Sequence, residues 1–335
     1  MSPRAPGQSA AQLTLSTNQI NTAGCNKEVA LDAALVEPMP VAAGHTREER
    51  LIHSTTGLAY GCSSLSGDKR PGGQAVSGAG SKNVRDPAVA GSFYPADPRR
   101  LEAEVARLLA QVPASGEPAP KALIAPHAGF VYSGAVAASA FAELRGCPEG
   151  IARIVVIGPA HYLPLRGVAL STAEAFATPL GCVAVDRDAL VTLADLPFVH
   201  AIDAAHTPEH AIEVELPFLQ SVLPRFTLVP LLVGDATPQQ VAEVLARLWG
   251  GGETLIVVSS DLSHYHDYET ARRLDAATAQ RIERGEWDAV GPGAACGRLP
   301  IAGLLMQGAR HGLAARRLAL CNSGDTAGAR HEVVG

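Results

Sequence analysis

The chain has 335 residues, and 47% of them are hydrophobic, which is enough to bury the core of one large domain or two smaller ones. Its formal net charge is -6 at pH 7 without a dense run of Lys or Arg, so the attraction that drives nucleic-acid binding is missing. No apolar run reaches the roughly 18 to 20 residues that cross a bilayer, and the N-terminus lacks the apolar stretch of a secretion signal. We therefore expect a cytoplasmic protein that binds neither nucleic acid nor membrane.

Residues 1–83 differ in composition from the rest of the chain. They are rich in Gly, Ser, Ala and Pro and contain a single aromatic residue, Tyr60. Such a segment cannot assemble a core of its own. We expect a disordered N-terminal extension, or sequence upstream of the true start, followed by an ordered domain over residues 84–335.

The first predicted helix follows the stretch "SFYPADP". Asp97 is a good N-cap, and Pro98 suits the first helical position. Apolar residues recur on one face of the helix, at Leu101, Val105, Leu108 and Val112. This pattern predicts an amphipathic helix packed on a larger body.

From residue 121 onward, predicted strands and helices alternate. The strands are 121–126, 153–159, 167–172, 181–185, 227–234, 254–260 and 316–322. The helices are about 133–145, 208–223, 237–249, 268–284 and 298–312. Several strands are continuous runs of Val, Ile and Leu, as expected when helices cover both faces of a sheet. We predict a single α/β domain on a mostly parallel central sheet flanked by helices, with an antiparallel hairpin near 167–185.

Three of these strands are followed by a histidine. "KALIAPH", "RIVVIGPAH" and "TLIVVSSDLSH" end in His127, His161 and His264. In open α/β sheets, ligands bind at the carboxyl ends of the strands. If the three strands are parallel neighbours, their histidines converge at one edge of the sheet. Pro126 and Pro159 stiffen two of the turns, as a metal ligand or catalytic base requires.

A second group of candidates lies in "AHTPEHAIEVELPFLQSVL". We expect a helix capped by Thr207, with Pro208 at its first position and a kink caused by Pro217. His210 and Glu213 are three residues apart and would share one face near the helix start. The positive end of the helix dipole would then lower the pKa of His210 and favour the neutral imidazole.

Cys296 is the best functional candidate among the six cysteines. In "GPGAACGRLPIAGLL" it lies just before an apolar helix, where a thiolate is stabilised. Arg298, two residues further on, would add positive potential or bind an anionic substrate.

These residues support more than one chemistry. Two neutral imidazoles and a thiolate form a three-ligand set for a first-row metal ion, and two histidines with one carboxylate form the facial triad of non-haem iron oxygenases. Asp261, Glu213 or Cys296 could supply the anionic ligand. His264 and His210 would then be free for proton transfer, with Asp261 fixing a tautomer. A rival hypothesis is a hydrolase with Cys296 as nucleophile, His264 as base and Asp261 as the orienting carboxylate.

Seven motifs occur in order along residues 84–335, namely "AGSFYPADP", "APHAGFVYSG", "VVIGPAH", "EHAIEVELPFLQ", "VVSSDLSHY", "ACGRLPI" and "NSGDTAG". Together they resemble the Memo (mediator of cell motility) family, including its prokaryotic members called AmmeMemoRadiSam system protein B. The family's fold is similar to that of class III extradiol dioxygenases, which are non-haem iron enzymes. The resemblance does not cover residues 1–83.

The resemblance implies roles for individual residues. Its metal-binding set corresponds to His127, His161 and Cys296, with Fe(II) or copper as the metal. It also implies that Asp261 and His264 lie beside the metal and that His210 lines the cleft. The chain stops at "HEVVG", where the family continues through a further strand, so the resemblance implies a truncated C-terminal strand and an incomplete sheet edge.

The leading hypothesis is a metal-dependent oxidoreductase with dioxygenase-like chemistry on a small organic substrate. Its catalytic residues would be His264, Asp261 and His210, and Glu213 and Arg298 would contact the substrate. The first alternative is a non-catalytic scaffold that binds a peptide or protein in the same cleft, and the second is the Cys296 hydrolase. The bacterial family name implies a radical SAM protein and an AMMECR-type protein as partners.

Overall fold

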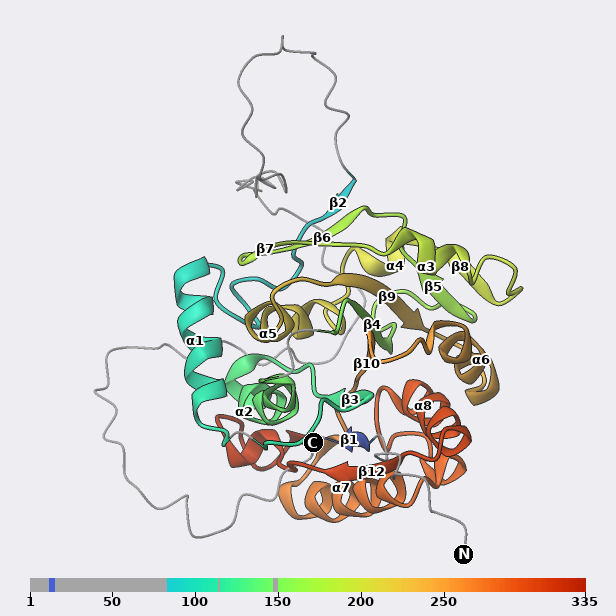
Figure 1. The fold of residues 1–335 in the computed structure, drawn as a ribbon. Helices are drawn as coiled ribbons and strands as arrows, with labels where there is room; N and C mark the ends of the chain where they lie inside the picture. Colours follow the sequence, from blue (N-terminus) through green and yellow to red (C-terminus); the bar gives the residue numbers. More distant parts are fainter. Residues whose placement is uncertain (1–11, 16–82, 114, 147–149) are drawn as a thin grey trace, which may run out of the picture.

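The computed structural model describes residues 12–15, 83–113, 115–146 and 150–335 (Figure 1). One eight-stranded sheet forms the centre of the fold. Its strands are, in spatial order, β12 (Ala314–Arg317), β1 (Gln12–Leu15), β3 (Ala122–Ala125), β10 (Thr254–Ser259), β4 (Arg153–Pro159), β9 (Thr227–Val233), β5 (Val168–Leu170) and β8 (Val199–Ala201). All neighbouring strands pair in parallel except β5 and β9, which are antiparallel. The prediction of a mostly parallel sheet is confirmed.

Two small sheets accompany the central one. β2 (Val84–Arg85), β6 (Ala175–Thr178) and β7 (Gly181–Ala184) form the first, in which β6 and β7 make an antiparallel hairpin within the predicted region. β11 (His264–His266) and β13 (Val333–Val334) form the second. The C-terminal residues therefore pair with the segment that follows β10, and the incomplete sheet edge stays a prediction.

Helices cover both faces of the central sheet (Figure 1). The α-helices are α1 (Pro98–Ala110), α2 (Phe130–Phe141), α3 (Arg187–Val191), α4 (Asp203–His206), α5 (Leu216–Val222), α6 (Pro238–Leu248), α7 (Tyr268–Glu283) and α8 (Arg298–Arg310). Four 3-10 helices are also described, η1 (Ala142–Leu144), η2 (Glu213–Glu215), η3 (Trp287–Ala289) and η4 (Ser323–Asp325). α1, α2 and α5 pack together on one side, α6 and α8 lie on the other, and α7 packs along β12.

Local sequence signals explain where several elements begin. Asp97 caps α1 by accepting a hydrogen bond from the Arg100 backbone N at 2.9 Å, as predicted. Thr237 and Gln240 form a reciprocal capping box at the start of α6. The last predicted strand is displaced, because β12 ends at Arg317 and residues 318–322 continue as irregular chain.

β1 lies inside the segment whose composition predicts a disordered extension. Its four residues pair in parallel with β12 on one side and with β3 on the other. The expectation therefore does not hold for residues 12–15. The remainder of residues 1–82 lies outside the described residues.

The order of the three central strands positions the candidate site. β10 pairs in parallel with β3 on one side and with β4 on the other. The strands that precede His127, His161 and His264 are therefore parallel neighbours, as predicted. Their carboxyl ends meet at one edge of the sheet.

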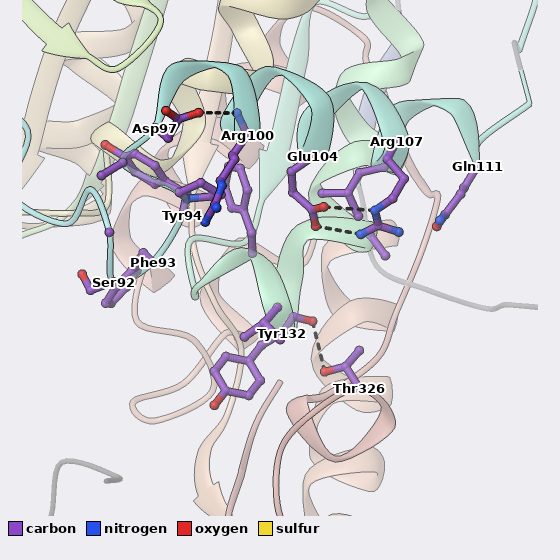
Figure 2. A pocket seen from close by; sticks show the side chains of 17 residues that line it. Ser92, Phe93, Tyr94, Asp97, Arg100, Glu104, Arg107, Gln111, Tyr132 and Thr326 are labelled. Carbon is purple, nitrogen blue, oxygen red and sulfur yellow. Dashed lines mark hydrogen bonds and ion pairs between the residues drawn. The ribbon is translucent and has the colours of Figure 1, made fainter. Parts of the chain in front are cut away.

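A cavity of about 770 Å³ lies beside this edge (Figure 2). Residues 91–97, α1 and α2 line it, and Thr326 closes one end, where its hydroxyl donates to the Tyr132 carbonyl at 3.3 Å. Phe93 belongs to this lining and also touches the His210 ring, with the ring centroids 4.9 Å apart.

Candidate metal centre

His127 follows β3 and is almost completely buried. Its Nδ1 lies 2.7 Å from the Ser259 hydroxyl, and this hydroxyl donates its own proton to the Ala211 carbonyl at 2.6 Å. Nδ1 must therefore carry the ring proton, which leaves a lone pair on Nε2. Burial lowers the pKa of His127 to about 4, so the ring is neutral at physiological pH.

His161 follows β4, and its ring is held by Glu209. One Glu209 carboxylate oxygen lies 2.9 Å from His161 Nδ1, and the other accepts the His161 backbone N–H at 2.6 Å. Because the carboxylate can only accept, Nδ1 carries the proton and Nε2 is again free. Burial opposes ionisation of Glu209, but hydrogen bonds from His161 and the backbone outweigh it and lower the pKa of Glu209 to about 2.

His210 lies in the loop between α4 and η2. Its Nδ1 is buried and lies 3.2 Å from Glu209 Oε1, without the alignment of a hydrogen bond and without another partner among the described residues. Burial lowers the pKa of His210. The predicted neutral imidazole agrees with this direction, but the predicted cause was wrong, because α4 ends at His206 and no helix begins at residue 208.

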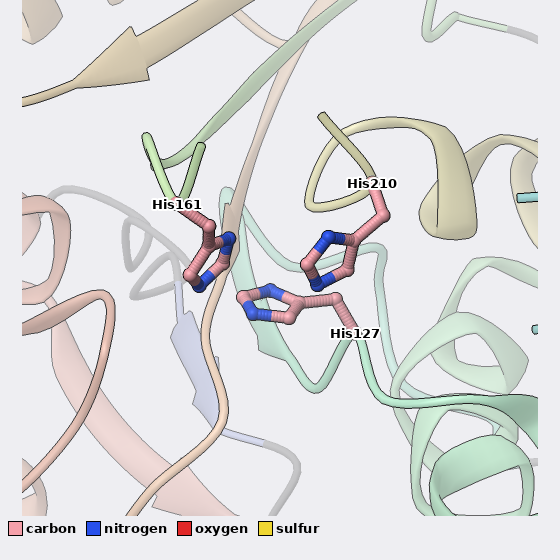
Figure 3. A group of neighbouring side chains, drawn as sticks. All are labelled: His127, His161 and His210. Carbon is pink, nitrogen blue, oxygen red and sulfur yellow. The ribbon is translucent and has the colours of Figure 1, made fainter. Parts of the chain in front are cut away.

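The three rings face one another (Figure 3). Each of His127, His161 and His210 offers one ring nitrogen, and these atoms lie within 4.8 Å of one another. The ring centroids of His161 and His210 are 4.7 Å apart, and the rings are nearly parallel. Three imidazoles with convergent ring nitrogens fit a transition-metal ion.

Cys296 lies next to this group. Its Sγ is 3.3 Å from His127 Nε2 and accepts the Asp261 backbone N–H at 3.2 Å. Burial raises the pKa of Cys296 to about 12, so the predicted thiolate is wrong for the protein without a metal ion. A Cβ atom on Gly297 would lie 2.5 Å from Ser260 Cβ, so only glycine allows this close approach of the Cys296 loop to the end of β10.

Asp261 joins the His127 and Cys296 segments. Its Oδ1 accepts the backbone N–H groups of His127 at 2.9 Å and Ala128 at 3.3 Å, and its Oδ2 lies 3.9 Å from His127 Nε2. Its backbone carbonyl accepts the Cys296 N–H at 3.2 Å. Asp261 therefore holds two candidate ligands in register and does not contact His264.

His264 stands apart from the three-histidine group, in β11. Its Nδ1 lies 2.9 Å from the Leu262 carbonyl, which can only accept, so Nδ1 carries a proton and Nε2 is the nitrogen that can accept one. The next residue, Tyr265, has φ of 61° and is 73% exposed. A bulky side chain rarely adopts this conformation, so the β11 turn is strained beside a candidate acid/base residue.

Two further candidates fall outside the cluster. Glu213 is completely buried, pairs with the Arg85 guanidinium and accepts from the Ala88 and Val89 backbone at 2.7 and 3.0 Å. Its oxygens are engaged by these partners in the core, and the predicted contact with substrate stays a prediction. Arg298 is the first residue of α8 and is partly exposed.

Comparison with known proteins identifies the family. A model of the family described as Memo-like protein matches residues 85–335. The chain belongs to this family. Proteins described as MEMO1 family proteins include one from Sulfolobus acidocaldarius, which is 34% identical over 278 residues, covering 75% of this chain and 97% of that protein. Others from Aeropyrum pernix and Methanosarcina acetivorans are 35% and 36% identical, with the same coverage.

In this Memo-like protein, two residues that support the histidines were missed from the sequence. Glu209 immediately precedes His210 in "PEHAIE", and Ser259 ends β10. Helical spacing favoured Glu213 over Glu209, because it assumed a helix from residue 208, whereas helical structure begins only after residue 212. A carboxylate adjacent to a candidate histidine was the signal that could have found Glu209.

Among the described helices of the Memo-like chain, none is long and apolar enough to cross a membrane.

Proposed function

We propose that this Memo-like protein binds a first-row transition-metal ion through His127, His161 and His210 and uses it in redox chemistry on a small organic substrate. The convergence of three ring nitrogens within 4.8 Å carries the proposal. His127 and His161 each keep their proton on Nδ1, so their Nε2 atoms are ready to bind a cation. Imidazole ligands suit iron and copper, and we propose Fe(II) or copper as the ion.

The third ligand distinguishes two versions of this site. Geometry favours His210, whose ring belongs to the convergent group. The family resemblance favours Cys296, whose sulfur lies 3.3 Å from His127 Nε2. A coordinated thiol loses its proton, so the raised pKa of Cys296 in the free protein does not exclude it. We propose His210 as third ligand and Cys296 as the alternative.

A bound iron or copper ion would supply electron transfer and Lewis acidity. The residues of the chain would supply orientation and proton transfer. Glu209 holds His161 by its Nδ1–H, and Ser259 does the same for His127. We propose that His264 accepts a substrate proton at Nε2, because the Leu262 carbonyl fixes the proton of the neutral ring on Nδ1.

The hydrolase alternative lacks its required contacts. Cys296 lies beside His127 rather than His264, and Asp261 bonds the backbone at residues 127 and 128. With a Cys296 pKa of about 12 and a His127 pKa of about 4, the neutral thiol and neutral imidazole are far more populated at pH 7 than the thiolate–imidazolium ion pair. The structure therefore favours no nucleophilic role for Cys296.

The test is metal binding by anaerobically prepared protein. We expect one equivalent of Fe(II) or copper in wild type, a rise in Tm on loading, and loss of both in His127→Ala. His210→Ala should weaken binding at least about tenfold, whereas Cys296→Ala should bind nearly as wild type. His200→Ala, an exposed histidine in β8, is the matched control and should not change affinity.

Two results would contradict the proposal in different ways. If wild type takes up neither metal and its Tm does not respond, the metal site is wrong and the non-catalytic scaffold becomes the better hypothesis. If Cys296→Ala loses the metal and His210→Ala keeps it, the site stands with the other third ligand. The radical SAM and AMMECR-type partners and the cytoplasmic location stay predictions from the sequence.

A further inference from the structure

The cavity between α1, α2 and residues 91–97 is separate from the three histidines, none of which lines it (Figure 2). Its volume of about 770 Å³ lies within the range of small-molecule sites, which is roughly 300 to 1,000 Å³. We propose that this cavity binds an amphiphilic monocarboxylate, with its apolar body against the aromatic side and its carboxylate on Arg100.

Aromatic and aliphatic side chains form the apolar side of the cavity. Its lining includes Phe93, Tyr94, Phe130, Val131 and Tyr132. Val131 is 63% exposed and Tyr132 is 40% exposed, although both belong to a helix packed on the core. Covering these groups with the apolar body of a ligand removes their surface from water, which is favourable.

The polar side of the cavity carries one positive charge without a partner. Glu104 is paired with Arg107 by two contacts at 3.0 and 2.7 Å, and Asp97 accepts the Arg100 backbone N–H. The Arg100 guanidinium has neither a hydrogen bond nor an ion pair within the described part of the chain, and it extends from α1 beside Tyr94 (Figure 2).

This charge pattern selects the ligand class. Of the two carboxylates in the lining, Glu104 is paired with Arg107 and Asp97 caps α1 through Oδ1, so neither offers both of its oxygens to a cationic ligand. A guanidinium fork matches a carboxylate with two parallel hydrogen bonds. One free guanidinium beside an apolar wall therefore favours a singly charged anion with an apolar body over a neutral or cationic molecule.

Phe93 links this cavity to the histidine cluster. Its ring touches His210, and its carbonyl accepts the Phe130 N–H at 2.8 Å, which ties the loop to the start of α2. A ligand in the cavity would therefore contact the residue that packs on the cluster. The inference does not depend on a metal ion, and its test uses metal-free protein.

The test compares by calorimetry two probes that share an apolar body and chain length, 4-phenylbutyrate, which ends in a carboxylate, and 4-phenylbutan-1-ol, which ends in an uncharged hydroxyl. Wild type should bind the acid about tenfold more tightly than the alcohol. Arg100→Gln should abolish this difference. Arg99→Gln makes the same charge change at the neighbouring exposed position of α1, outside the lining, and should keep the difference.

A second variant locates the probe. Ala135 lines the cavity from α2, and Ala135→Phe should fill it and weaken both probes at least about tenfold. Equal affinity for acid and alcohol in wild type, or the same effect from Arg99→Gln and Arg100→Gln, would overturn the proposal. Because Arg100 and Arg99 are both exposed, this comparison is decisive even if Ala135→Phe fails to fold.

Discussion

Glu209 organises two of the three clustered rings. Its carboxylate binds His161 through the ring and the backbone, and it accepts the backbone N–H groups of His210 and Ala211 at 2.8 and 3.0 Å. A carboxylate behind a metal-binding histidine fixes the tautomer and raises the basicity of the ring. Glu209 is therefore a positioning residue for the proposed centre.

Glu209→Gln should lower the affinity for Fe(II) or copper by about 10- to 100-fold, because an amide cannot accept from the ring and the backbone through both of its terminal atoms. Competition against a chelator of known affinity measures the change. Glu243→Gln, an exposed glutamate of α6, is the control and should bind as wild type. Equal affinities in the two variants would remove Glu209 from the site.

His206 makes folding stability depend on pH. Burial lowers its pKa to about 4, from 6.5, while the unfolded chain keeps the higher value. As pH falls from 6.5 to 4, His206 becomes protonated in the unfolded chain but stays neutral in the native state. The free energy of unfolding therefore decreases, by up to about 3 kcal/mol. His206→Gln should flatten this acid-side slope in urea unfolding, whereas exposed His200→Gln should leave it unchanged. Identical slopes in both variants would contradict the assignment.

At the scale of elements, residues 207–213 show why helical spacing in the sequence does not produce a helix here. Arg85 donates to the carbonyls of His206 at 3.1 Å, Thr207 at 3.4 Å and Glu209. These carbonyls would accept the i+4 N–H groups of a helix through this segment. Arg85 takes their place, so the helix begins only after residue 212. Pro217 then falls in the first turn of α5, where it causes no kink.

The ion pair of Arg85 with Glu213 should therefore stabilise the whole loop. Both side chains are buried, so Glu213→Ala leaves an unpaired charge in the core and should cost about 3–5 kcal/mol of unfolding free energy. The exposed pair of Arg272 with Glu269 is the control, and Glu269→Ala should cost less than about 1 kcal/mol. Urea unfolding measures both, and similar losses would show that the buried pair is not special.

At the scale of the whole molecule, β1 joins two parts of the chain that are far apart in sequence. It lies between β3 and β12 and pairs with both in parallel. Deleting residues 1–15 removes this strand and leaves the edges of β3 and β12 that it pairs with without these backbone hydrogen bonds. We expect a loss of about 2–5 kcal/mol relative to deletion of residues 1–11 alone, since each lost backbone hydrogen bond costs about 1 kcal/mol. Equal stability of the two truncated chains would mean that the sheet does not need β1.

Local sequence patterns alone determined the central strands, the start of α1 and the meeting of two histidines. Continuous apolar runs predicted the central strands, and Asp97 and Pro98 predicted the start of α1. Histidines after parallel strands predicted that His127 and His161 meet, because neighbouring parallel strands end at the same edge. These features depend on local backbone preferences and on the period of the sequence.

Tertiary structure alone decided which third ring joins them. His264 lies five residues beyond β10, in the short strand β11, which pairs with β13. Arg85 binds the 207–213 loop, and His210 of this loop lies in the cluster. Burial also decided that Cys296 is a thiol rather than a thiolate. No local pattern reports these outcomes, because each depends on contacts between segments at least 35 residues apart, as between Cys296 and Asp261, or between Arg85 and Glu209, which are 124 residues apart.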